Sequence, residues 1–190
     1  MKVNYVTTNT MKFEVAQAYF DKLSDDYELV QYKIDTPEIQ STSTIDIARQ
    51  SALWAAKETG EICIKMDAGF FINALKGFPG PFIKYVNDWL TQEEFLALLS
   101  NKDDRSAYFE DATAVAFPDG RSEVFSLKTY GSVSTQINPV SDKWPANLLF
   151  IPEGHTEALG FLSPEEQNKF WGDGNWPQVI QFLESYAHEA

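Results

Sequence analysis

The segment 7–12, which reads Thr-Thr-Asn-Thr-Met-Lys, carries side chains suited to binding a phosphate. It falls between a predicted strand and a predicted helix, and a helix N-terminus offers free backbone N–H groups and a partial positive charge. Thr8 and Asn9 add side-chain donors, and Lys12 adds a cation on the first turn. The same residues also suit an ordinary capped helix, because Thr and Asn are favoured N-caps. The segment alone leaves both interpretations open.

Two acidic residues are candidate metal ligands. Asp67 interrupts the strongly apolar run Ile62–Ile72, where a carboxylate is costly unless it is paired, hydrogen-bonded or bound to a metal. A place at the solvent-exposed end of a strand explains Asp67 equally well. Glu38 follows Pro37 in a loop, where a carboxylate is ordinarily just solvated. Two carboxylates that converged beside a phosphate would supply the oxygen ligands that Mg2+ needs, with waters completing the octahedron.

The elements that must position these residues follow from apolar periodicity and turn signals. Alternation and β-prone composition predict strands over 2–7, 27–32, 62–72, 107–117, 122–132 and 148–151. Helical spacing and cap signals predict helices over 11–23, 44–58, 82–90, 92–100 and 176–188, with another that starts at Ser163. We therefore expect one mixed α/β domain over 1–190, with an elongated sheet flanked by helices. A second lobe, mainly 82–140, would leave a central cleft.

The composition narrows the class of partner. Hydrophobic residues make up 44% of the chain and aromatic residues 14%, which indicates a folded protein. The net charge of −13 would repel nucleic acids and anionic membranes, so we expect neither as a partner. The single cysteine, Cys63, lies in an apolar run and is expected to be buried. No signal peptide or transmembrane-length run is evident, so we expect a cytoplasmic protein.

Four segments, in this order, resemble motifs of the inosine triphosphatase family, which hydrolyses non-standard purine nucleoside triphosphates to monophosphate and pyrophosphate. Residues 7–12 resemble its phosphate loop, Thr-x-Asn-x-x-Lys, and residues 66–70 resemble its acidic strand motif. Residues 75–85 match its Leu-x-Gly-x-Pro-Gly segment in the form typical of the eukaryotic branch, which 104–108 also follow. The resemblance covers about residues 1–132 well, and the succession of motifs is more specific than any one of them.

The resemblance implies roles for particular residues. Glu38 and Asp67 would bind Mg2+, with Mn2+ as the alternative, and Asp67 and Lys12 would be catalytic. Asp67 would also activate the attacking water. The substrate-binding residues would be Thr7, Thr8, Asn9, Thr10, Met11, Lys12, Ala68, Trp144 and Asn147. Family members are usually homodimers, so a homodimer is expected, and the substrate would be a nucleoside triphosphate.

The chain departs from the family pattern at several positions. Met66 stands where an acid is usual, Ala68 where Ser or Thr is usual, and Ser51 where a lysine of the second helix contacts substrate. Gln167 falls on a distal lysine, and Trp144-Pro145-Ala146-Asn147 falls on the Phe-Gly-Trp/Tyr-Asp motif of the base pocket. The Ser-His-Arg signature that reads the purine falls near Trp171-Gly172-Asp173.

These departures leave the phosphate and metal residues largely in place and change those that read the base. We hypothesise a Mg2+-dependent nucleoside triphosphate pyrophosphohydrolase whose base preference differs from inosine and xanthosine. Trp144, Trp171 and Trp176 could stack on a base, although packing is the commoner role of an aromatic residue. The alternative is a catalytically degenerate member of the fold that binds a nucleotide or a protein partner without turnover.

Overall fold

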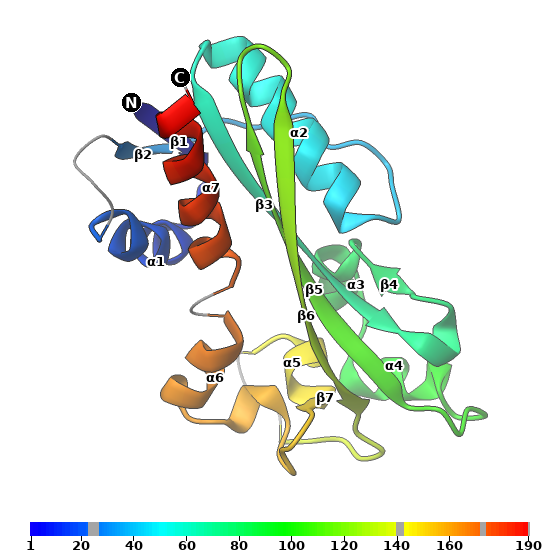
Figure 1. Ribbon diagram of the computed structural model, residues 1–190. Helices are drawn as coiled ribbons and strands as arrows, with labels where there is room; N and C mark the ends of the chain where they lie inside the picture. Colours follow the sequence, from blue (N-terminus) through cyan, green and yellow to red (C-terminus); the bar gives the residue numbers. More distant parts are fainter. Residues whose placement is uncertain (23–26, 140–142, 172–173, 190) are drawn as a thin grey trace. The chain divides into compact units, whose positions relative to one another are not determined.

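The computed structural model describes residues 1–22, 27–139, 143–171 and 174–189 (Figure 1). Its strands are β1 (Lys2–Val6), β2 (Glu28–Tyr32), β3 (Ile62–Ile72), β4 (Pro79–Gly80), β5 (Ser106–Ala116), β6 (Ser122–Val133) and β7 (Phe150–Pro152). Its α-helices are α1 (Thr10–Phe20), α2 (Thr44–Thr59), α3 (Ile83–Trp89), α4 (Gln92–Leu98), α5 (Pro145–Leu149), α6 (Pro164–Trp171) and α7 (Trp176–Glu189). Asn73–Leu75 and Leu159–Phe161 form short 3-10 helices. Within this described part, no helix is long and apolar enough to cross a membrane.

The strands form one mixed sheet in the order β2-β1-β3-β5-β6-β7, and β4 pairs with β3. β1 runs parallel to both β2 and β3, with Val3 opposite Leu29 on one side and Ile62 on the other. Parallel neighbours require crossover connections, which α1 and α2 supply. β7 is antiparallel to β6. The predicted class, a mixed α/β sheet with flanking helices, is confirmed.

Contacts divide the chain into two compact units. The first comprises Met1–Asp67, Asp111–Leu127 and Asp173–Ala190, and the second comprises Ala68–Glu110 and Lys128–Gly172. Strands β3, β5 and β6 contribute residues to both units. Each unit has an apolar core of its own.

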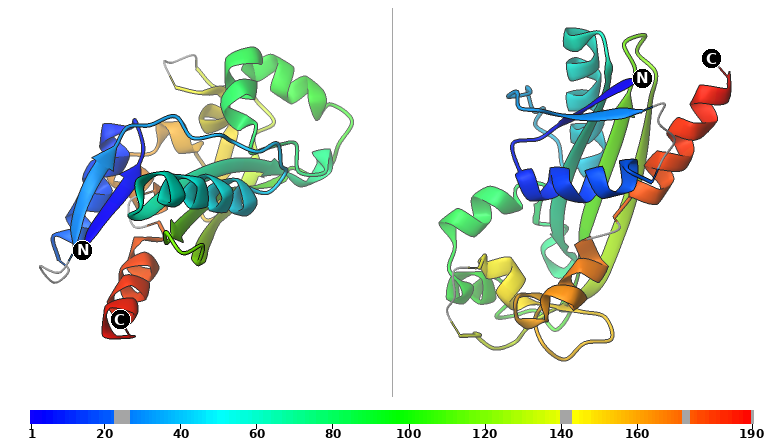
Figure 2. Two further views of the ribbon diagram at one scale, coloured as in Figure 1. Left: turned by 90° about the horizontal axis from the view of Figure 1, so that it is seen from above. Right: turned by 90° about the vertical axis from the view of Figure 1, so that its left-hand side faces the viewer.

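In the first unit, the two faces of β3 contact different apolar clusters. Ile64 and Met66 pack in the cluster that includes α1 and α7, whereas Cys63 belongs to the cluster that includes α2. Side chains alternate between the faces of a strand, so Lys65 and Asp67 share the face of Cys63, toward α2. Figure 2 shows α2 running alongside β3. The strand therefore presents two charged side chains on one face and an apolar row on the other.

The core of the second unit is centred on three aromatic rings from β3, β5 and β7. Phe70 stacks on Phe109 with ring centroids 4.5 Å apart, and Phe150 lies edge-on to both, at 5.6 and 5.0 Å. Gly131 of β6 lets β7 come close, since a Cβ there would lie 2.6 Å from the Phe150 ring and against the Ile151 carbonyl. Only glycine fits this position without displacing its neighbours.

The structure corrects two predicted elements. The predicted strand over 148–151 is wrong in its first half, because α5 runs to Leu149 and only then does β7 begin. Pro145 opens α5 where a missing N–H costs nothing, and the Ala146 N–H donates to Asn87 Oδ1 at 3.1 Å. The predicted helix over 11–23 begins at Thr10 and ends at Phe20.

The predicted start of the helix after Ser163 is confirmed. The Ser163 hydroxyl accepts the backbone N–H of Glu166 at 3.3 Å, and the Glu166 carboxylate accepts the Ser163 N–H at 3.0 Å. This reciprocal pair is a capping box, which satisfies two N–H groups at the start of α6.

Candidate active site

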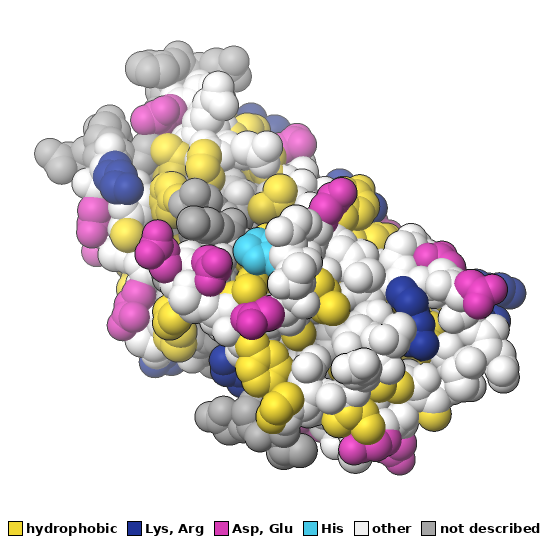
Figure 3. Space-filling view, turned by 90° about the horizontal axis from the view of Figure 1, so that it is seen from below, with side chains coloured by type: hydrophobic (Ala, Val, Ile, Leu, Met, Phe, Trp, Pro, Cys, Tyr) yellow, Lys and Arg dark blue, Asp and Glu magenta, His cyan; other side chains and the backbone are white. Residues whose placement is uncertain are grey.

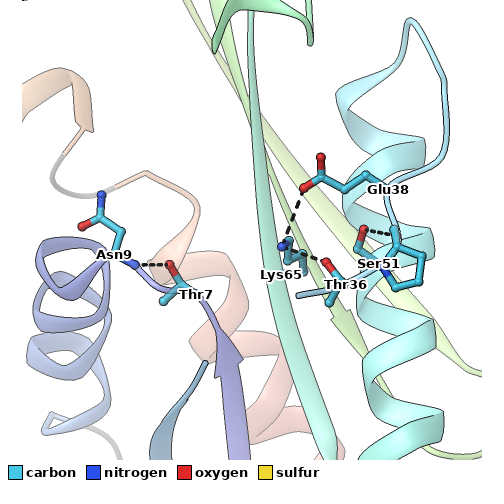
Figure 4. A network of polar contacts seen from close by, with 7 residues as sticks. Thr7, Asn9, Thr36, Glu38, Ser51 and Lys65 are labelled. Atoms are coloured by element: carbon cyan, nitrogen blue, oxygen red, sulfur yellow. Dashed lines mark hydrogen bonds and ion pairs between the residues drawn. The ribbon is translucent and has the colours of Figure 1, made fainter. Parts of the chain in front are cut away.

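The segment 7–12 connects β1 to α1 and forms the N-terminal end of that helix. Asn9 is the N-cap, and its Oδ1 accepts the Lys12 backbone N–H at 3.2 Å. Thr7 Oγ1 accepts the Asn9 N–H at 3.1 Å (Figure 4), and the Thr7 carbonyl accepts a bond from Gln31 of β2. The ordinary capping role is thus realised. The side chains of Thr8 and Lys12 remain exposed at the helix start, where a phosphate would meet them.

Lys65 of β3 lies among the predicted site residues, and the sequence interpretation missed it. Its Nζ donates a hydrogen bond to Thr36 Oγ1 at 3.0 Å and lies 3.9 Å from Glu38 Oε1 (Figure 4). The Lys65 side chain is 17% exposed and that of Glu38 is 55% exposed. A lysine two residues before Asp67 on an otherwise apolar strand was the available signal, because side chains at that spacing share a face.

Three charged residues predicted for the site, Lys12, Glu38 and Asp67, all influence the pKa of the Lys65 ammonium group. Burial lowers the pKa of Lys65, and the neighbouring carboxylates of Glu38 and Asp67 act in the opposite direction. The cation of Lys12 lowers the pKa further, and Asp35 raises it. The structure therefore brings Lys12, Glu38 and Asp67 into one electrostatic neighbourhood in the first unit, with Lys65 among them.

Ser51 of α2 fixes the loop that carries Glu38. Its side chain is fully buried, and its hydroxyl donates to the Pro37 carbonyl at 3.3 Å (Figure 4). Ser43 caps the same helix by accepting the Asp46 N–H at 3.1 Å. At the position where the resemblance expects a lysine, this chain has a small residue that ties the loop to α2.

The carboxylates could hold a divalent cation together with a bound phosphate. Among the described residues, no group of three or more His, Cys, Asp or Glu side chains gathers as a complete metal cage. Mg2+ rarely needs such a cage, because it is usually held by one or two carboxylates with waters and substrate phosphates. Glu38 and Asp67 both act on the Lys65 ammonium, and carboxylate oxygens are the kind of ligand that Mg2+ takes.

The remaining predicted binding residues lie in the second unit. Trp144 precedes α5 as its N-cap and is 53% exposed, and its carbonyl accepts the Asn147 N–H at 3.0 Å. Ala68 is half-buried on β3. Gln167 of α6 donates its side-chain amide to the Leu162 carbonyl at 2.7 Å, so its Nε2 is engaged within its own helix start.

Two of the three tryptophans considered for base stacking can be assessed. Trp176 of α7 is 2% exposed and packs edge-on against Tyr5 and Phe20, with ring centroids 5.2 and 6.4 Å away. The base-stacking interpretation of Trp176 is therefore wrong, and its role is packing. Trp144 keeps an exposed ring. The side chain of Trp171, with Gly172 and Asp173, lies outside the described residues.

The chain matches the family model described as the Ham1 family over residues 3–171. It is 32% identical to a dITP/XTP pyrophosphatase of Thermococcus kodakarensis over 169 residues, 89% of each chain. It is 35% identical to another of that name from Methanothermobacter marburgensis, over 90% of this chain and 89% of that one. The solved Staphylococcus aureus Ham1 protein shares the fold, with a TM-score of 0.82 at 21% identity, over 98% of this chain and all of that one. The mixed α/β fold and the comparisons with known proteins together place the chain among nucleoside triphosphate pyrophosphohydrolases. The chain belongs to the Ham1 family.

Proposed function

We propose that this protein hydrolyses a non-standard purine nucleoside triphosphate to the monophosphate and pyrophosphate, with Mg2+. The observation that carries the proposal is the cluster of Lys12, Glu38, Lys65 and Asp67 near the N-terminus of α1. Relatives at 30–35% identity over most of this chain are named dITP/XTP pyrophosphatases, which supports a pyrophosphohydrolase.

The overall charge of the protein makes this cluster informative. The chain carries a net charge of −13, and on the face seen in Figure 3 basic side chains lie singly among acidic and apolar ones. An anionic triphosphate therefore needs local positive charge to bind. Lys12 at the start of α1 and Lys65 on β3 bring two ammonium groups within electrostatic reach of one another. Glu38 and Asp67 offset this positive charge in the free protein, and a metal bound to those carboxylates would leave the two ammonium groups to attract an anionic substrate.

The protein groups divide the work of hydrolysis. At the start of α1 the N–H groups of Asn9 and Lys12 are bonded within the segment, so the exposed Thr8 side chain binds phosphate oxygens and Lys12 neutralises part of their charge. A divalent cation held by Glu38 and Asp67 would, when bound, offset the charge that develops on the phosphates. Asp67 accepts a proton from the attacking water while the water oxygen bonds to the α-phosphorus. The bond between that phosphorus and the α–β bridging oxygen breaks, and pyrophosphate leaves. The products are the monophosphate and pyrophosphate.

The base preference is proposed to differ from inosine and xanthosine. The positions that the family uses to read the purine carry Trp144 and Asn147 here, and Trp144 presents an exposed indole that suits stacking rather than a dense set of hydrogen bonds. A homodimer is also proposed, as the resemblance to the inosine triphosphatase family implies, and sedimentation at high protein concentration would detect it. A monomer under those conditions would remove the dimer from the proposal.

A second function deserves a test because one observation favours it. Met66, which replaces an acid of the family motif, faces the apolar cluster of α1 and α7, so the strand offers one carboxylate fewer. A member of the family that binds a nucleotide without turning it over would fit that loss. Pyrophosphate release distinguishes the two functions.

The experiment is a pyrophosphate-release assay with Mg2+ over a panel of common and modified ribo- and deoxyribonucleoside triphosphates. The proposed activity predicts release from at least one non-standard purine substrate and its loss in Asp67→Asn. Glu123→Gln, which removes an exposed carboxylate from β6 in the same unit, is the matched control and should keep full activity. No release from any triphosphate would reject hydrolysis in favour of binding. Inosine and xanthosine triphosphates as the best substrates would refute the altered base preference.

A further inference from the structure

Lys65 has more hydrogen-bonding capacity than its observed contacts use. An ammonium group has three N–H donors, and among the described residues one of those of Lys65 makes a hydrogen bond, to Thr36. Lys65 Nζ and Glu38 Oε1 form an ion pair at 3.9 Å. This separation is much longer than that of the usual charge-assisted hydrogen bond, so the pair has no direct hydrogen bond. The group is thus held loosely, although its side chain is only 17% exposed.

A lysine so far removed from water is costly unless anions surround it. Glu38 and Asp67 supply that negative charge, and both would be taken by a divalent cation in the proposed reaction. Once a metal binds them, the ammonium loses its counter-ions and needs another anion. The triphosphate that arrives with the metal provides one.

We propose that Lys65 alternates between two anions: it balances Glu38 and Asp67 when the site is empty, and binds a phosphate group of the substrate when a metal occupies those carboxylates. This inference rests on the proposed triphosphate site and adds to it a phosphate-binding residue. Position 51 of α2, where the resemblance expects a lysine, supplies no charge, because Ser51 is buried and hydrogen-bonded to Pro37, and Lys65 supplies the cation from β3 instead.

The exchange makes two predictions of opposite sign for Lys65→Met. Mn2+ alone, measured by electron paramagnetic resonance, should bind about five- to tenfold more tightly, because the competing ammonium is gone. Inorganic tripolyphosphate, measured calorimetrically at saturating Mg2+ so that the carboxylates are occupied, should bind about five- to tenfold more weakly, because a cation is lost. A purely structural role for Lys65 would weaken both, or neither.

Two further variants make the test decisive. Lys65→Arg keeps the charge and should stay within about threefold of the parent protein for both probes. Lys57→Met removes an exposed lysine near the end of α2 in the same unit and should leave both affinities unchanged. Circular dichroism would establish that each variant is folded before binding is measured.

The outcomes separate this inference from the proposed function. Opposite shifts for the two probes support the exchange, even if the parent protein releases no pyrophosphate, in which case only the hydrolytic function fails. Unchanged Mn2+ affinity, or weaker binding of both probes, overturns the exchange even if the protein hydrolyses triphosphates.

Discussion

Asp67→Asn should separate the contribution of this carboxylate to catalysis from its contribution to stability. The substitution keeps the shape of the side chain and removes its charge from the half-buried middle of β3. Lys65 then retains Glu38, 3.9 Å away, as a counter-ion, so the free energy of unfolding should change by about 1 kcal/mol or less. Activity should fall at least about 100-fold, because losing a proton acceptor alone typically costs 10²–10⁴ in rate.

A 100-fold loss corresponds to about 2.7 kcal/mol of transition-state stabilisation, well above the expected change in stability. The assay is pyrophosphate release at saturating substrate, paired with urea unfolding of the same protein samples. If activity fell less than about threefold, or if the protein lost several kcal/mol of stability in step with its activity, Asp67 would be a structural residue and the assignment would be refuted. Glu123→Gln, measured in parallel, calibrates the effect of losing a carboxylate that faces solvent.

Other substitutions and conditions test the remaining parts of the structure. Trp176→Ala should destabilise the protein by about 3–5 kcal/mol in urea unfolding, since the ring is buried, whereas Trp144→Ala should cost about 0.5 kcal/mol or less because its ring is exposed. Gly131→Ala should cost about 1–3 kcal/mol and lower the thermal midpoint, and an unchanged midpoint would argue against the close approach of β7. A chelator should abolish pyrophosphate release and leave the far-ultraviolet circular dichroism unchanged; full activity without metal would exclude the proposed cation. Burial raises the pKa of the Cys63 thiol, so the unfolded chain loses its thiol proton at a lower pH than the folded protein. The urea midpoint should therefore decrease as the pH rises above the ordinary thiol pKa. Cys63→Ser should flatten that part of the pH profile, and an equally steep fall in the variant would assign the effect elsewhere.

Much of the first unit could be predicted from the sequence because its signals are local. Apolar periodicity located β3 and α2 to within a residue or two, and the cap role of Asn9 follows from the residues beside it. The succession of motifs also led to the family, which the comparison over residues 3–171 confirms. These features depend on neighbours in sequence, or on spacing that a strand or helix fixes.

What the sequence did not predict depends on distant contacts. Lys65 donates a hydrogen bond to Thr36, which lies 29 positions earlier. The residues near either one in the sequence do not indicate that the two are partners. Helix α5 includes Leu148 and Leu149, where an apolar run suggested a strand, since Asn87 of α3 binds its first turn. The sequence favoured packing for Trp144, Trp171 and Trp176 alike, and the contacts of Trp176 with Tyr5 and Phe20 show that it is a packing residue.

The alternation of side chains along β3 has a consequence for how this protein can change over time. Ile64 and Met66 face an apolar cluster, so substitutions there are constrained by volume, whereas Lys65 and Asp67 face the charged neighbourhood and are constrained by chemistry. Alternate residues of one strand can therefore be substituted nearly independently of one another, one set affecting packing and the other affecting charge. A substitution at position 66 changes packing in that cluster, whereas a substitution at position 65 or 67 changes the charge of the proposed site. Specificity could drift in this way without first dismantling the fold.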